Sequence, residues 1–163
     1  MSIERGIRTA FALARLVLGI DVLTKAAIVA LVEPGAQHVW LPVFNIVLLL
    51  LNRGAAFSLL HDAGGWQRAF FIAVALAASV LLWSMIRRPA TTPAERLAFA
   101  LILGGALGNM VDRVVRGAVV DWLDFHWGPH HFPAFNAADL GISLGVALML
   151  AHAIGWTSRS TRQ

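Results

Sequence analysis

The chain has 163 residues, of which 58% are hydrophobic and 13% charged, whereas soluble domains have about 45–50% apolar and about 25% charged residues. This composition excludes an ordinary soluble domain and predicts one integral membrane domain, residues 1–163, because lipid tolerates apolar side chains facing outward. The absence of cysteine excludes disulfides, thiolate metal sites and a cysteine nucleophile. The net charge of +4 does not indicate binding to nucleic acid, because the arginines are scattered among apolar runs.

Four apolar stretches predict four transmembrane helices, since a span needs about 20 predominantly apolar residues. The predicted spans cover roughly residues 9–32, 66–86, 97–115 and 136–156. The third is shorter than the others and ends in polar residues. The apolar run over 39–51 is shorter still and is interrupted by Pro42 and Asn45, so interfacial or extended structure is predicted there.

Positive charge predicts the orientation of these spans. With four spans both termini lie on one side, which also holds the turn between the second and third spans. Seven arginines fall on that side: Arg5, Arg8, Arg87, Arg88, Arg96, Arg159 and Arg162. The positive-inside rule makes this side cytoplasmic. The loops over roughly 33–65 and 116–135 then lie outside, and function is expected on that outer side.

Polar residues near a span need a reason, because an ionisable side chain in hydrocarbon costs roughly 2.5–3.5 kcal/mol. Asp21 and Lys25, in DVLTK, lie at i and i+4 and can pair along one helix face. This pair either eases the cost of its own burial or supports a site. Further along, the segment LNRGAAFS contains Asn52 and Gly54, and it suits a turn against which a peptide could lie; an ordinary turn explains it equally well.

The third polar group lies in LILGGALGNMVDRVVRG, at the end of the third predicted span. Gly104 and Gly108 form a small-xxx-small face that favours close helix packing. Asn109, Asp112 and Arg113 fall at i, i+3 and i+4, on one side of the helix. The simpler interpretation is that Asp112 and Arg113 anchor the helix end.

Two aspartates flank the outer loop between the third and fourth spans. Asp121 follows the third span in VVDWLDF, and Asp139 begins the fourth span in FNAAD. Two carboxylates held close together share one proton, so that one acts as a base and the other as an acid, as hydrolysis of a peptide bond by activated water requires. The alternatives are a solvated loop carboxylate for Asp121 and, for Asp139, a capping residue of a helix that starts at Asn136.

Other chemistries remain as alternatives. His126 and His130 have an H-x3-H spacing next to His131, but Gly128 and Pro129 break the helical geometry that a zinc-binding HExxH motif requires. A small transporter or channel would relay protons through intramembrane acids and would need Asp21 and Asp112 as much as the other pair. A non-catalytic assembly factor held together by its glycine faces would need neither Asp121 nor Asp139.

Five motifs occur in order along nearly the whole chain, from about Asp21 to Asp139: DVLTK, NRGAAFS, GGALGNMVDR, GAVVDW and FPAFNAAD. Together they resemble the lipoprotein signal peptidase (signal peptidase II) family of bacterial aspartyl peptidases. The resemblance implies an all-α integral membrane fold of four transmembrane helices, with a small β-rich extracytoplasmic platform between helices 1 and 2. It also implies multi-pass insertion in the bacterial inner membrane, with both termini cytoplasmic and the active site near the periplasmic face.

The resemblance further implies removal of the signal peptide from diacylglyceryl-modified prolipoproteins, with cleavage before the lipidated cysteine. The implied catalytic pair is Asp121 and Asp139. Positions that line the site or orient the substrate are Asn52, Gly54, Asn109, Arg113 and Asn136. Asp21, Lys25 and Asp112 match positions expected to give structural support, and the histidines of HWGPHH are expected at the surface. A monomer that contacts substrate and membrane lipid, with no cofactor and no metal, is expected.

Overall fold

The computed structural model describes residues 2–33, 37–41, 44–52 and 65–155, and it contains four helices and four strands in this part of the chain. The helices are α1 (Ile3–Leu31), α2 (Trp66–Arg87), α3 (Pro93–Val115) and α4 (Ala137–Ala153). The strands are β1 (Gln37–Leu41), β2 (Phe44–Asn52), β3 (Val119–Trp127) and β4 (His130–His131). One helix lies in each of the four predicted spans, although α1 and α3 start earlier and α4 ends earlier than the predicted bounds.

The ends of the helices follow from local sequence. Ser2 caps α1, and its hydroxyl accepts a hydrogen bond from the backbone N–H of Arg5. Thr92 caps α3 in a capping box with Glu95, and Pro93 occupies the first helical position, where a missing N–H has no cost. Asn136 begins α4 in the same manner. α1, α3 and α4 therefore each start at a residue whose side chain caps the helix, whereas α2 follows Gly65, which has a φ of 95° and provides no side-chain cap.

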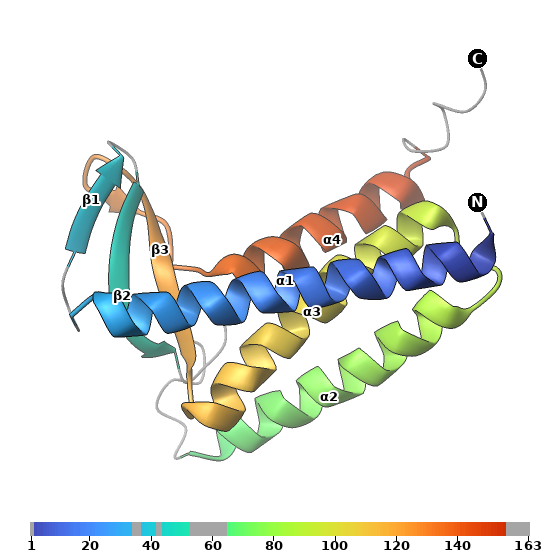
Figure 1. Ribbon diagram of the computed structural model, residues 1–163. Coiled ribbons are helices and arrows are strands. Elements are labelled where there is room, and N and C mark those ends of the chain that lie inside the picture. Colours follow the sequence, from blue (N-terminus) through green and yellow to red (C-terminus); the bar gives the residue numbers. More distant parts are fainter. Residues whose placement is uncertain (1, 34–36, 42–43, 53–64, 156–163) are drawn as a thin grey trace.

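The helices form a bundle with α3 at its centre (Figure 1), and α3 packs against each of the other three. Its packing surface contains glycine, as the sequence predicts: a Cβ atom on Gly104 would lie 2.6 Å from the backbone oxygen of Ala14. The absence of that atom allows α1 and α3 to approach closely. In the part of the chain that the structure describes, α2 and α3 are long and apolar enough to cross a membrane, and α4 is a shorter apolar helix.

The strands form one antiparallel sheet in the order β1-β2-β3-β4, which lies across one end of the bundle (Figure 1). The start of α1, the end of α4 and the α2–α3 turn lie at the opposite end. The expectation that the β-rich platform lies only between helices 1 and 2 is incomplete. β3 and β4 come from the connection between α3 and α4, and the pairing of β2 with β3 joins this connection to the one between α1 and α2.

Candidate active site

Asp121 lies on β3, close to the end of α3. The first residues of β3, Val119 to Asp121, are buried, and Asp121 is only 7% exposed. Its Cα pairs with that of Leu49 on β2. The alternative of a solvated loop carboxylate is therefore wrong, because this carboxyl group is buried on a paired strand.

Asp139 lies in the first turn of α4, in the capping box that the sequence predicts. The side-chain oxygen of Asn136 accepts a hydrogen bond from the backbone N–H of Asp139 at 3.0 Å. In return, Asp139 Oδ2 accepts from the backbone N–H of Asn136 at 3.2 Å. The helix starts beside β3 because Phe135 pairs with Leu123, and its carbonyl oxygen accepts from the N–H of Leu123 at 2.9 Å.

Asn136 also connects the two aspartates. Its side-chain amide donates to Asp121 Oδ1 at 2.7 Å, while its backbone N–H donates to Asp139 as described above. The residue is fully buried, so water does not compete for these bonds. The cap of α4 thus brings a carboxyl group from a strand and another from a helix into one hydrogen-bonded group.

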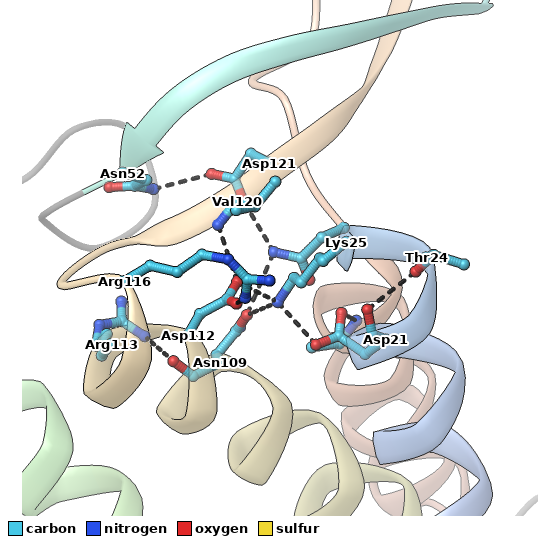
Figure 2. Close-up of polar contacts among 12 residues, drawn as sticks. Asp21, Thr24, Lys25, Asn52, Asn109, Asp112, Arg113, Arg116, Val120 and Asp121 are labelled. Carbon is cyan, nitrogen blue, oxygen red and sulfur yellow. Dashed lines mark hydrogen bonds and ion pairs between the residues drawn. The ribbon is translucent and has the colours of Figure 1, made fainter. Parts of the chain in front are cut away.

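Two further asparagines complete the set of donors. Asn52, at the end of β2, donates from Nδ2 to Asp121 Oδ2 at 3.2 Å (Figure 2). Asn109, on α3, donates from Nδ2 to Asp139 Oδ1 at 2.9 Å. Each of the four carboxylate oxygens therefore accepts a hydrogen bond from an asparagine side chain or backbone.

The environment of Asp121 favours its protonated form. Burial is the largest cause, and the negative charge of Asp139 acts in the same direction. Together they raise the pKa of Asp121 from 3.8 to about 6, although the hydrogen bonds from Asn52 and Asn136 act in the opposite direction. The two carboxyl groups are thus electrostatically coupled, and a proton resides on Asp121 at mildly acid pH.

A buried cluster of charges lies beneath this pair. The ion pair between Asp21 and Lys25, predicted from their spacing, is confirmed at 2.7 Å, and both side chains are fully buried. Lys25 also lies 3.1 Å from Asp112 Oδ2 and donates to Asn109 Oδ1 at 2.9 Å. Asp112 pairs in addition with Arg116. Figure 2 shows the Lys25 ammonium group between the side chains of Asp21 and Asp112.

Arg113 has different partners from its neighbour Asp112. Its guanidinium group lies 4.9 Å from the centroid of the Phe71 ring and donates to the backbone oxygen of Asn109 at 3.3 Å. It also interacts electrostatically with Asp121 and Asp139. Asp112 contacts Lys25, Arg116 and the backbone of Val120, so the two neighbouring residues have different partners.

The histidines and Gly54 are less closely connected to this site. His126 and His131 face each other across the β3–β4 hairpin with stacked rings, and His131 Nδ1 lies 2.9 Å from Asp124 Oδ1. His130 and His131 are exposed as expected, but His126 is partly buried and both of its ring nitrogens are buried, which corrects the expectation for His126. Gly54 lies outside the described residues.

Two residues with buried side-chain contacts were not singled out from the sequence, Arg116 at the charge cluster and Asp124 on the hairpin away from the two aspartates. Arg116 follows Asp112 by four residues, so the i, i+4 spacing was a usable signal. Asp124 gave no such signal, because its partner His131 approaches it only through the hairpin.

The chain is similar to known proteins over most of its length. The family described as Signal peptidase (SPase) II matches residues 13–155. A lipoprotein signal peptidase of Paraburkholderia phymatum is 48% identical over 135 residues, which are 83% of this chain and 81% of the relative. Lipoprotein signal peptidases of Burkholderia vietnamiensis and Burkholderia mallei are 47% and 45% identical over the same shares.

Two solved structures, each described as a bacterial membrane enzyme, share the fold at 30% identity. Their TM-scores are 0.82 and 0.77; the matches cover 95% and 89% of this chain, and 93% and 92% of those chains. The bundle with its sheet therefore has the fold of a bacterial membrane enzyme. The chain belongs to the signal peptidase II family, a family of proteases that remove signal peptides from prolipoproteins.

Proposed function

We propose that this protein is an aspartic endopeptidase that cleaves diacylglyceryl-modified prolipoproteins immediately before the lipidated cysteine, with Asp121 and Asp139 as its catalytic residues. The observation that carries this proposal is the bridge made by Asn136, which holds both buried carboxyl groups in one hydrogen-bonded group. Two coupled carboxyl groups that share a proton are suited to acid–base hydrolysis of an amide.

The pKa of Asp121, raised to about 6, supports a division of roles in which Asp121 is the proton donor and Asp139 the base. Asp139 takes a proton from water as the water oxygen attacks the scissile carbonyl carbon, and Asp121 donates its proton to the carbonyl oxygen. When the tetrahedral intermediate collapses, Asp139 gives its proton to the departing nitrogen and Asp121 recovers one from the hydroxyl group. The pair then returns to its starting state.

The supporting residues have matching roles in this proposal. Asn52 donates a hydrogen bond to Asp121 Oδ2, and Asn109 donates one to Asp139 Oδ1. Arg113 places a positive charge near both and balances the negative charge of the singly protonated pair. Gly54, two residues after Asn52 in the sequence, is proposed to permit close approach of an extended substrate. The proposal includes a monomeric enzyme that needs no cofactor.

We further propose that all four helices span the inner membrane, with the termini cytoplasmic and the sheet at the periplasmic face. Arg5 and Arg8 at the start of α1, and Arg87 and Arg88 at the end of α2, lie at the end of the bundle away from the sheet. That distribution follows the positive-inside rule. A substrate anchored by a lipid and a hydrophobic signal helix would then reach the site by lateral diffusion.

The transporter alternative receives no support from the charges on which it depends. Asp21 and Asp112 are held by the same lysine, at 2.7 and 3.1 Å, and a proton relay would have to break this cluster. Membership of a protease family also favours the peptidase proposal over an assembly factor.

Mass spectrometry of the cleavage products tests the proposed reaction. Purified protein in detergent, with a chelator present, is incubated with a diacylglyceryl-modified prolipoprotein peptide and with the same peptide lacking the lipid. We expect one cut in the lipidated peptide, releasing a fragment whose first residue is the modified cysteine, and little cleavage of the unmodified peptide. Cleavage at another bond, equal cleavage of both peptides, or inhibition by the chelator would contradict the proposal.

A further inference from the structure

The cluster formed by Asp21, Lys25 and Asp112, here called the buried triad, is costly as a stabilising element alone. Its three side chains are 0%, 0% and 3% exposed. Removing ionised groups from water costs several kcal/mol for each ion, and their mutual attraction often does no more than offset that cost. The other contacts of the triad indicate a further role.

Each carboxylate of the triad accepts a backbone hydrogen bond from a residue that directly precedes one of the two aspartates of the site. Asp21 Oδ1 accepts from the N–H of Ala138 at 2.8 Å. Asp112 Oδ2 accepts from the N–H of Val120 at 3.0 Å (Figure 2). Ala138 precedes Asp139 on α4, and Val120 precedes the other aspartate on β3. The two backbone segments are thus tied to two carboxylates that share one lysine.

Lys25 adds a third connection, through Asn109. An ammonium group can only donate, so the oxygen of the Asn109 amide faces Lys25 and the amide nitrogen is left to donate to Asp139. The Asn136 side-chain amide donates to the same oxygen at 3.3 Å, so Lys25 and Asn136 together select the orientation of the amide that holds Asp139. Loss of Lys25 removes the shorter of these two bonds and weakens the constraint on the amide.

The packing around Asp21 fits the same role. Gly108 lies against the carboxyl group of Asp21, and a Cβ atom at that position would collide with it. The close contact fixes the side chain between α1 and α3, so its position relative to the start of α4 is well defined. The triad is consequently built into helix packing and is not a local feature of one helix.

We infer that the buried triad sets the separation of Asp121 and Asp139. The hydrogen bond from the backbone of Val120 to Asp112 positions Asp121, and the one from the backbone of Ala138 to Asp21 positions Asp139. This inference rests on the proposed function only for the claim that these two aspartates carry out catalysis. Asp21, Lys25 and Asp112 are positioning residues, because they act through Val120, Ala138 and Asn109.

Two consequences distinguish positioning from general stability. First, the two pKa values of carboxyl groups that share a proton differ more as the groups come closer. A change in the triad that lets the two aspartates move apart therefore makes the two pKa values more similar. Second, misplacement of catalytic groups by about 1 Å lowers the rate by about 10²-fold. Loss of stability without displacement produces neither effect.

The test compares Lys25→Met with Ile86→Ala as the matched control. Ile86 is fully buried in the core cluster at the end of α2 away from the sheet, so its truncation lowers stability without touching the triad. The double variant Lys25→Met/Asp21→Asn is included because it leaves no unpaired carboxylate, Asp112 keeping Arg116. The pKa values of the pair are measured by ¹³C NMR of labelled aspartate carboxyl groups, and kcat and KM by cleavage of the lipidated peptide.

We expect both triad variants to bring the two pKa values closer by about one pH unit and to lower kcat by about 10²-fold with little change in KM. Ile86→Ala should keep the wild-type separation and kcat despite a lower melting temperature. If Lys25→Met does not fold, the double variant carries the test. If the folded triad variants kept the wild-type difference between the two pKa values, the inference would be overturned. The NMR measurement needs no substrate, so a wild type that cleaves nothing would contradict the proposed function alone.

Discussion

Asn136 has two uses at once, as the cap of α4 and as a side-chain donor to β3. The sequence predicts the first use, because an asparagine three residues before an aspartate at the start of an apolar run is a capping signal. It does not predict the hydrogen bond to Asp121, which depends on the pairing of Phe135 with Leu123. The candidate pair was predictable from the residues and their family resemblance, but the bridge between its members depends on tertiary structure.

At the same scale, Asn52→Ala should change the pH dependence of catalysis. The hydrogen bond from Asn52 stabilises the ionised form of Asp121, so its loss raises the pKa of Asp121 above the wild-type value of about 6. In the proposed mechanism activity falls as the pair loses its shared proton. The alkaline limb of kcat/KM, which reports the free enzyme, should therefore move upward by about 0.5–1 pH unit.

The measurement is a profile of kcat/KM against pH for wild type and variant. Wild type should lose activity as the pH rises through about 6. A downward shift of the alkaline limb in Asn52→Ala would contradict the assigned sign. An unchanged limb would mean that this hydrogen bond does not control the proton of the pair.

Among the elements, the helices were predictable and β3 was not. Long apolar stretches and capping residues indicate helices directly. β3, with the sequence VVDWLDFHW, has no strict alternation of apolar and polar residues, and its partner β2 is more than 60 residues away in the chain. The sequence therefore indicates a connection between the third and fourth helices but gives no sign that it completes a sheet with the connection between the first and second.

Close packing of α1 against α3 leads to a prediction about two glycines. In Gly104→Ala the new Cβ atom would lie 2.6 Å from the backbone oxygen of Ala14 and 2.7 Å from Val17 Cβ, so the helices must separate. We expect a loss of about 1–3 kcal/mol in the free energy of unfolding. Gly19→Ala is the matched control, because a Cβ atom there has no neighbour within 4 Å. That change should raise stability by about 0.5–1 kcal/mol.

Thermal unfolding in detergent, followed by circular dichroism, measures both variants. The expected order of melting temperatures is Gly19→Ala at or above wild type and Gly104→Ala clearly below it. Equal melting temperatures for the two variants would show that the glycine face is not needed for packing of α1 against α3.

For the whole molecule, the proposed orientation places the sheet outside and the α2–α3 turn in the cytoplasm. The chain has no cysteine, so single cysteines can report topology without background. His130 on the hairpin and Ala90 in the α2–α3 turn are both exposed. In spheroplasts, a membrane-impermeant maleimide should label His130→Cys directly and Ala90→Cys only after permeabilisation. The reverse labelling pattern would invert the proposed orientation and remove the site from the periplasmic face.

The central claim is that Asp121 and Asp139 together hydrolyse the peptide bond, and turnover of the lipidated peptide by aspartate variants tests it most directly. Asp124→Asn is the matched control, because Asp124 is a buried aspartate on the same strand that is bonded to His131 and not to the pair. With a chelator present throughout, we predict that Asp121→Asn and Asp139→Asn lower kcat by at least about 10³-fold in folded protein, and that Asp124→Asn stays within about threefold of wild type. Retained activity in either Asp121→Asn or Asp139→Asn would contradict the two-aspartate mechanism.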